Sequence, residues 1–558
     1  MPAPLPDPFY YLGNFERVLC WIAERYADLL SEEEFAFLAT FPTLPQSSRA
    51  LLVRMAMRKG DLFRASKLRY DEIGCPRAAV LPLQALGWVD AAPLLSLEQL
   101  FGLLTRSELA GVLAPAAPGA RKADWLAALL DDAPPPQPLG TWCVALDDVA
   151  YRITIAELCE RLRLMFFGNL RQDWSEFVLA DLGIYRYETV PLTPDSRGFQ
   201  QRQDIDDALQ LHCARDAMRE GAMLADVLAQ VPPARTGNAW LAGRRARLLF
   251  QIAQQYERQC EWDAALALYR DCGYPGARAR AIRVLERSGD DAAACALAEA
   301  ALAAPESDAE RQQLLRMLPR LRRRAGLPSA RIARPMATER LDLSLPRPAQ
   351  PYPVEALVRN HLAQPDAPVF YVENGLLGSL FGLLCWPAIF APVPGAFFHP
   401  FHHGPADLGS PDFHSRRRAL FDACLAQLDT GQYRDTIRAQ WRAKQGIQSP
   451  FVAWGLLDEA LLELALHCLP PPHLKRCFER MLRDVTTHCA GLPDLIQFWP
   501  TQGCYRMIEV KGPGDRLQDN QLRWLAYFAE HGIPVAVCYV QWALDAPTPQ
   551  SDDVTASV

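Results

Sequence analysis

Residues 491–524 read GLPDLIQFWPTQGCYRMIEVKGPGDRLQDNQLRW. The segments 495–499 and 505–510 have the apolar and aromatic character of strands, and the short turn between them predicts a β-hairpin. A helix over 516–530 is expected next, because its apolar side chains recur at helical spacing. A third strand over 535–540 completes the pattern. This part of the chain therefore predicts an α/β domain.

Three charged residues lie where the two strands of this hairpin begin and end. Asp494 precedes the first strand, while Glu509 and Lys511 share one face of the second, because side chains alternate across a strand. Carboxylates that converge at a strand edge can hold one or two Mg²⁺ or Mn²⁺ ions, with the backbone carbonyl of Val510 as a further candidate ligand. A neighbouring lysine can orient the attacking water and stabilise the transition state. A lone Glu-x-Lys is usually an exposed ion pair, but this context favours a metal-dependent phosphodiesterase.

Composition sets the frame for this domain. At 558 residues the chain is too long for one core, so three or four domains are expected. Half of the residues are hydrophobic and 22% are charged, as in soluble globular proteins. The 15 cysteines form no Cys-x-x-Cys pair, which argues against a zinc ribbon or redox site. The sequence shows neither a signal-peptide pattern nor a membrane span, so we expect a cytoplasmic protein that associates with the nucleoid when it binds DNA.

The charge distribution bears on nucleic-acid binding. A net charge of −7 argues against it only weakly, because binding depends on local patches. Arginines, which can contact phosphate oxygens in bidentate fashion, occur in several clusters, although a solvated helix face is the simpler explanation of any one cluster. The candidate DNA-binding residues are Arg58, Lys59, Arg64, Lys67, Arg244, Arg245, Arg283, Arg416 and Arg417.

The pattern along the chain predicts a mainly α protein with a C-terminal α/β domain. Capping boxes at Ser31 and Ser96 open helices, and the proline-rich stretches 133–140 and 347–355 mark boundaries. Helix pairs over 247–301 suggest stacked, tetratricopeptide-like (TPR-like) repeats that serve as a spacer or bind a repair protein. The predicted regions are a helical N-terminal DNA-binding region (1–92), a SAP-like DNA-binding module (93–135), a helical-repeat domain (141–346), a nuclease domain (352–545) and a disordered polar tail (546–558).

The motifs also carry a resemblance. GLPDL, EVKGPGDRL and Gln521-x-x-Trp524 resemble the virus-type replication-repair nuclease domain of the PD-(D/E)xK superfamily, and in particular the Fanconi-associated nuclease family. Residues 373–375 and 378–390 resemble that family's helix bearing the first catalytic acid, and 415–417 and 68–74 are similar as well. The resemblance implies Glu373, Asp494 and Glu509 as metal ligands, Lys511 as the catalytic lysine and Gln521 as a supporting residue.

The same resemblance implies an activity. Members are structure-specific DNA nucleases that cut near 5′ flaps, proceed 5′ to 3′ and act in DNA repair, including the repair of interstrand crosslinks. The chain has no Cys/His framework for the ubiquitin-binding zinc finger of eukaryotic members, which indicates a bacterial-type protein. Asn520 occupies a position where those members have a lysine near the 5′-phosphate pocket, so dependence on that phosphate stays open.

Two alternatives remain at this level. A Holliday-junction resolvase or restriction-like endonuclease can have the same core, but symmetric cleavage of two strands needs a two-fold dimer, and we expect a monomer. A protein of another class, a non-catalytic helical-repeat scaffold for DNA repair, would bind branched DNA or a repair protein without cutting. No membrane partner is expected in any of these cases.

Overall fold

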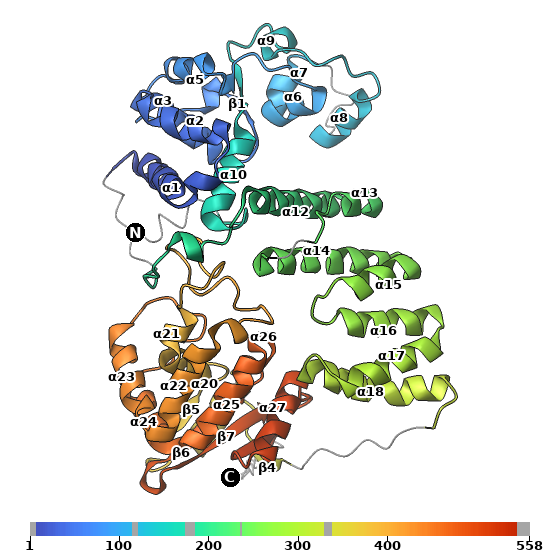
Figure 1. Cartoon of the computed structure of the whole chain (residues 1–558), viewed down its shortest axis with the longest axis vertical. Helices are drawn as coiled ribbons and strands as arrows, with labels where there is room; N and C mark the ends of the chain where they lie inside the picture. Colours follow the sequence, from blue (N-terminus) through green and yellow to red (C-terminus); the bar gives the residue numbers. More distant parts are fainter. Residues whose placement is uncertain (1–6, 114–120, 173–184, 235–236, 329–337, 544–558) are drawn as a thin grey trace, which may run out of the picture. The chain divides into compact units, whose positions relative to one another are not determined.

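The computed structural model describes residues 7–113, 121–172, 185–234, 237–328 and 338–543, so the predicted tail at 546–558 lies outside the described residues. The chain forms two compact units (Figure 1). The first comprises residues 1–186, 191–213 and 397–401, and the second comprises 187–190, 214–396 and 402–558. Helices predominate, and a mixed sheet forms near the C-terminus, as predicted.

The first unit begins with helices that bury aromatic and aliphatic side chains. Ser31 caps its helix as predicted: its hydroxyl accepts from the Glu34 amide while the Glu34 side chain accepts from the Ser31 amide. Phe15 and Phe41 pack against each other in the core between these helices. The helices of this segment are α1 (Tyr10–Tyr26), α2 (Glu32–Thr40), α3 (Gln46–Ala56), α4 (Pro76–Ala79) and α5 (Leu81–Ala85).

The segment 1–92, expected to be helical throughout, also contributes two strands to a small antiparallel sheet. The sheet has the order β1-β3-β2, with β1 at Leu62–Arg64, β2 at Val89–Asp90 and β3 at Ala150–Ile153. The central strand β3 follows the proline-rich stretch 133–140. The strand β1 is hydrogen-bonded to a segment remote in sequence, which explains why local periodicity did not reveal it.

Short helices between β2 and β3 enclose a separate core around Leu100, Phe101 and Trp125. The capping box predicted at Ser96 is present, with the Gln99 side chain as its partner. The helices here are α6 (Leu97–Leu103), α7 (Arg106–Ala110), α8 (Lys122–Leu129) and α9 (Leu139–Trp142). The unit continues with α10 (Ala156–Phe167) and the first part of α12 (Arg202–Glu220), up to Cys213.

The second unit contains a row of helices, each packed against the next (Figure 1). The helix pairs predicted over 247–301 are present as α14 to α17. Their cores are lined by small and aliphatic residues, among them Ala294 and Ala298, which allow close approach of the helix backbones. The elements are α13 (Leu224–Ala229), α14 (Ala239–Arg258), α15 (Trp262–Asp271), α16 (Ala277–Ser288), α17 (Asp291–Ala303) and α18 (Asp308–Arg324).

A five-stranded mixed sheet forms the centre of the C-terminal domain. Its order is β4-β8-β7-β6-β5; β4 and β7 run parallel to β8, whereas β6 is antiparallel to both β7 and β5. The predicted hairpin is therefore present as β6–β7. The strands are β4 (Glu339–Leu345), β5 (Val369–Tyr371), β6 (Leu495–Trp499), β7 (Cys504–Lys511) and β8 (Val535–Trp542). The strand β4 lies within 141–346, the segment assigned from sequence to the helical repeats.

Helices surround this sheet, and the helix α20 is buried along its whole length, which matches its almost wholly apolar sequence. The helix expected over 516–530 begins at Asp519, because Gln518 caps it. Among the described residues, no helix combines the length and apolar character needed to cross a bilayer. The helices are α19 (Val354–Leu362), α20 (Leu376–Leu384), α21 (Trp386–Ile389), α22 (Arg418–Thr430), α23 (Tyr433–Ala443), α24 (Glu459–Cys468), α25 (Pro471–Arg483), α26 (Val485–His488) and α27 (Asp519–Glu530).

Candidate active site

Asp494 stands directly before β6 and is tied to both neighbouring strands. Its Oδ2 accepts a hydrogen bond of 2.8 Å from the Val510 amide on β7, and its backbone carbonyl accepts one of 2.8 Å from the Val372 amide after β5. The preceding Gly491 has φ +85, and a Cβ there would lie 2.8 Å from the Asn520 side chain. A glycine is therefore required for this approach to α27.

Glu509 and Lys511 project from the same face of β7, as the alternation predicted. Lys511 Nζ lies 2.7 Å from Glu509 Oε1, and both side chains are buried. Val510 points the other way, into a core with Leu495 and Val540. The hairpin thus brings Asp494, before the start of β6, together with Glu509 and Lys511, at the end of β7, although they are separated in sequence.

The two carboxylates of this hairpin are poorly stabilised as anions. The pKa of Asp494 is raised to about 6, mainly by burial and further by the charges of Glu355 and Glu373. The hydrogen bond from the Val510 amide and the charge of Lys511 lower it, but by less. Burial followed by the charge of Asp494 raises the pKa of Glu509 to about 7, despite Lys511. Two neighbouring carboxyl groups whose pKa values are raised together are typical of a functional site.

Glu373 lies in the turn between β5 and α20, three residues before the first residue of α20. The sequence comparison placed it on a helix; the structure shows that α20 begins only at Leu376, after Gly375. Its exposed carboxylate accepts hydrogen bonds from the side chains of Tyr371 and Asn374. Its charge acts on both Asp494 and Glu509, which places all three acids around one region.

Gln521, expected to support the acids, has a local structural role. Its side-chain oxygen accepts a hydrogen bond of 2.8 Å from the Gln518 amide and completes the capping box of α27. Asn520 lies beside it, against Gly491. These two residues therefore fix the start of α27 next to the Asp494 loop, a contact that positions the site indirectly.

The donor set suits a hard divalent cation. Among the described residues, Glu509 Oε1 is buried without a hydrogen bond of good geometry, although Lys511 Nζ is close. The available ligands are carboxylate oxygens, which Mg²⁺ and Mn²⁺ prefer. Within the same described ranges, no three His, Cys, Asp or Glu side chains stand together as a completed cage. The protein alone thus presents a carboxylate pair, with Glu373 as a third acid beside it.

Comparison with known proteins decides the family. Family models match residues 9–90 (FAN1, HTH domain), 94–142 (Fanconi anemia-associated nuclease SAP domain) and 428–542 (VRR-NUC domain). The chain is 58% identical over 544 residues to the Fanconi-associated nuclease 1 homolog of Pseudomonas aeruginosa, with 97% of each chain covered. The chain belongs to the Fanconi-associated nuclease family. It is a bacterial-type member and a DNA nuclease, which excludes the non-catalytic scaffold.

Other relatives of the Fanconi-associated nuclease family agree. The rice homolog is 24% identical over 96% of this chain and 63% of its own length, and the human protein is 31% identical over 30% of this chain and 17% of its own length. The crystal structure of paFAN1 bound to 2nt 5′ flap DNA with gap superimposes with a TM-score of 0.90, 57% identity and coverage of 98% of this chain and 100% of that chain. The nuclease domain of this chain is of the PD-(D/E)xK type, which implies dependence on a divalent metal.

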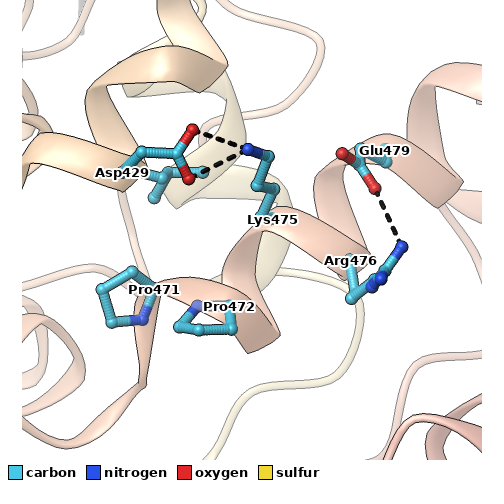
Figure 2. A pocket seen from close by; sticks show the side chains of 7 residues that line it. Asp429, Pro471, Pro472, Lys475, Arg476 and Glu479 are labelled. Atoms are coloured by element: carbon cyan, nitrogen blue, oxygen red, sulfur yellow. Dashed lines mark hydrogen bonds and ion pairs between the residues drawn. The ribbon is translucent and has the colours of Figure 1, made fainter.

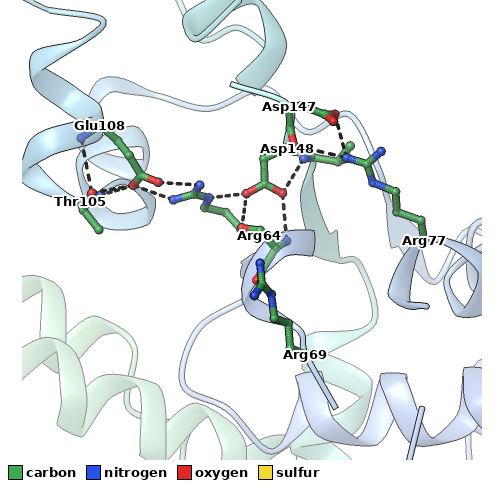
Figure 3. A network of polar contacts seen from close by, with 9 residues as sticks. Arg64, Arg69, Arg77, Thr105, Glu108, Asp147 and Asp148 are labelled. Carbon is green, nitrogen blue, oxygen red and sulfur yellow. Dashed lines mark hydrogen bonds and ion pairs between the residues drawn. The ribbon is translucent and has the colours of Figure 1, made fainter. Parts of the chain in front are cut away.

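Two of the arginines predicted to bind DNA in this family member are buried. Arg64 donates from Nε to Asp148 at 2.7 Å and through two nitrogens to Glu108 at 2.8 and 2.9 Å (Figure 3). Arg417 is likewise buried and holds both oxygens of Asp407 at 2.8 Å. The prediction is wrong for these two, because a buried guanidinium that is paired with carboxylates is not available to a phosphate.

The other candidates differ in how open they are. Arg58, Lys59 and Lys67 are exposed at the end of α3 and after β1. Arg58 donates to the Lys67 carbonyl at 3.4 Å and lies over the Tyr70 ring. The remaining four are partly or fully exposed and also have partners: Arg244 lies over the Trp240 ring, Arg245 donates to the Pro232 carbonyl, Arg283 is 3.6 Å from Glu257, and Arg416 pairs with Asp407. The three exposed residues are therefore the strongest candidates for a phosphate contact.

A surface pocket of about 530 Å³ lies elsewhere on the nuclease domain, between α22 and α25 (Figure 2). Its two cations are paired, since Lys475 Nζ lies 2.7 Å from Asp429 and Arg476 lies 3.7 Å from Glu479. None of the acids at the sheet edge lines it. This pocket is therefore separate from the Asp494–Glu509–Lys511 group. Its lining residues are Leu428, Asp429, Pro471, Pro472, Lys475, Arg476 and Glu479.

Proposed function

We propose that this protein hydrolyses one strand of branched DNA near a 5′ flap and continues 5′ to 3′, in the repair of damaged DNA including interstrand crosslinks. The observation that carries the proposal is the buried Asp494–Glu509–Lys511 constellation at adjoining strands. The flap DNA in the paFAN1 crystal structures, one with a 2nt and one with a 1nt 5′ flap, supports the choice of substrate.

In this proposal Asp494, Glu509 and Glu373 hold one or two Mg²⁺ or Mn²⁺ ions, with the carbonyl of Val510 as a further oxygen ligand. A bound divalent ion supplies Lewis acidity and lowers the pKa of water. The protein contributes the rest. The Val510 amide fixes the orientation of the Asp494 carboxylate through a hydrogen bond of 2.8 Å. The Lys511 ammonium, 2.7 Å from Glu509, is placed to orient the water and to offset charge that develops on the phosphate.

The exposed cations Arg58, Lys59 and Lys67 are proposed to contact phosphates of the duplex. They lie within the segment matched by the FAN1 HTH model, next to the segment matched by the SAP model. Contacts to the backbone position a duplex without reading its sequence, which suits an enzyme that recognises the shape of a junction.

The test compares cleavage of end-labelled 5′-flap, 3′-flap and Holliday-junction DNA in Mn²⁺ by the wild type and by Asp494→Asn. We expect selective cutting of the 5′ flap and a loss of at least about 100-fold in the variant, since removal of one stabilising group typically costs that much. DNA affinity should be retained, because Asp494 is not among the exposed cations proposed to contact the duplex. Symmetric cutting of the junction would overturn the flap assignment, and an unimpaired variant would overturn the site.

A further inference from the structure

Two side chains hold Glu373, the acid that stands apart from the Asp494–Glu509 pair. The Tyr371 hydroxyl donates a short hydrogen bond to Glu373 Oε2, and Asn374 Nδ2 donates one of 3.3 Å to Oε1. Each carboxylate oxygen therefore has its own donor. Because a carboxylate offers about four lone-pair sites, both oxygens keep a site for a cation. An exposed glutamate would otherwise sample many rotamers.

Tyr371, the last residue of β5, reaches Glu373 in the turn that follows the strand. Within β5 it pairs with Leu495 of β6. The next residue, Val372, donates its amide to the Asp494 carbonyl at 2.8 Å. The hydroxyl that holds Glu373 is thus carried on the same ladder of hydrogen bonds that fixes Asp494.

Asn374 links Glu373 to the Asp494 loop from the other side. Its φ of +52 lies in the left-handed region, which is uncommon for a residue other than glycine. In this conformation its Oδ1 accepts a hydrogen bond of 3.1 Å from the Leu492 amide, two residues before Asp494. At the next residue, Gly375, a Cβ would lie 2.4 Å from the Leu456 side chain, so a larger residue would displace that leucine. The turn is therefore fixed by its surroundings.

We propose that Tyr371 and Asn374 are positioning residues that hold the Glu373 carboxylate ready to complete the divalent-metal site with Asp494 and Glu509. The inference rests on the proposed function, which makes Glu373 a metal ligand. Hydrogen bonds from outside the ligand set orient metal ligands in general, and their removal commonly costs 10- to 100-fold in metal affinity. The two side chains act at the lower end of this range, because each contributes one hydrogen bond.

The experiment measures Mn²⁺ binding to the metal-free, full-length protein by calorimetry. Tyr371→Phe removes only the hydroxyl, from a side chain that is 42% exposed, so folding should be unaffected. Asn374→Gly keeps the left-handed backbone accessible and removes the carboxamide. Tyr352→Phe, at another exposed tyrosine of the domain, is the matched control. We expect Mn²⁺ affinity to fall about 10-fold in each test variant and to stay unchanged in the control.

Kinetics on a 5′ flap separate positioning from a general structural effect. In the two test variants, kcat should fall at low Mn²⁺ and recover at saturating Mn²⁺, while the KM for DNA stays constant. Thermal unfolding of metal-free Tyr371→Phe should match the wild type, whereas Asn374→Gly should unfold at a lower temperature, because it also loses the hydrogen bond to the Leu492 amide. Mn²⁺ affinity equal to the wild type in both variants would overturn the proposal, and so would tighter binding, since that would mean that the two side chains hold Glu373 away from the ion.

Glu373→Gln distinguishes this proposal from the one on which it rests. If that variant binds Mn²⁺ and cleaves as the wild type does, Glu373 is no ligand and the proposed site itself is wrong. If Glu373→Gln weakens Mn²⁺ binding while Tyr371→Phe and Asn374→Gly do not, only the positioning role is overturned.

Discussion

Two clusters of buried charge, one in each unit, differ in how their charges are balanced. Around Arg64, the carboxylate of Asp148 accepts hydrogen bonds from the Ser66 amide and hydroxyl as well as from the guanidinium, and Glu108 completes the set (Figure 3). Burial works against ionisation of Asp148, but these hydrogen bonds hold its pKa below the usual value. Hydrogen bonds from Arg64 and the Thr105 amide lower the pKa of Glu108 to about 2.

At the edge of the nuclease sheet the balance is the reverse. Asp494 and Glu509 share one lysine, and burial together with repulsion from neighbouring acids raises both pKa values. The first cluster joins β1 to the α7 segment and to the approach to β3, so its role is structural. The second keeps negative charge that the protein itself does not neutralise, which is the condition for binding a cation. Burial alone thus does not separate a structural cluster from a functional one, whereas charge balance does.

The strongest test of this contrast is the removal of Arg64. Arg64→Met leaves Asp148 buried without its partner, and loss of one member of a buried ion pair typically costs about 3–5 kcal/mol. The free energy of unfolding of the first unit, measured by urea denaturation, should fall by this amount. Arg69→Met, at an exposed neighbour, is the control and should change stability by less than about 0.5 kcal/mol. A loss of unfolding free energy below about 1 kcal/mol for Arg64→Met would contradict the structural role of the Arg64 cluster.

Asp494→Asn should have the opposite effect on the metal-free protein. A raised carboxyl pKa means that the folded state binds more protons than the unfolded state between about pH 4 and 7, so stability falls as pH rises through this window. The variant removes one titrating group and should be more stable than the wild type at pH 8, by roughly 1–3 kcal/mol.

The measurement is urea unfolding in a chelator at pH 5 and pH 8. Wild-type stability should decrease between the two values, and the variant should show a smaller decrease. Mn²⁺ affinity of the wild type should rise over the same interval, because protons and the ion compete for the same oxygens. A wild-type stability that increases between pH 5 and pH 8 would contradict the raised pKa values of Asp494 and Glu509.

The smallest expected effect concerns the exposed cations, which belong to neither of the two buried clusters. Arg58→Ala with Lys67→Ala should weaken binding of flap DNA and reduce the slope of log K against log salt by about 0.9 for each lost phosphate contact. Lys475→Ala, which removes a lysine already paired with Asp429, serves as the control. An unchanged slope, measured by fluorescence anisotropy from 50 to 200 mM salt, would place the duplex elsewhere.

The sequence was most informative where interacting residues are close along the chain. The hairpin β6–β7 and the capping boxes of Ser31 and Ser96 were predicted because strand alternation and helix capping act over a few residues. The assignment of Arg64 to DNA failed because its partner Asp148 lies in a distant segment, and no local pattern shows that β1 pairs with β3. Until the pairing with Asp148 is known, the sequence around Arg64 is equally compatible with an exposed basic surface and with a buried strand.

Tyr371 and Asn374 were missed for a different reason. Their signals were local: the tyrosine stands only two residues before the acid, and Asn-Gly is typical of a left-handed turn. The charge of Glu355 near Asp494 had no such signal, because it depends on how α19 packs against β5 and β7. Attention to the neighbours of a candidate ligand would have recovered the first two but not the third.

The strand β4 has a practical consequence for anyone who isolates the nuclease domain. It runs along β8 over the full length from Glu339 to Leu345 and forms the outer strand of the sheet. A fragment that starts at residue 352, the boundary suggested by the proline-rich stretch, would leave β8 as a bare edge of eight largely buried residues. Uncovered edges of this kind pair between molecules and aggregate. A soluble fragment should therefore begin upstream of Glu339.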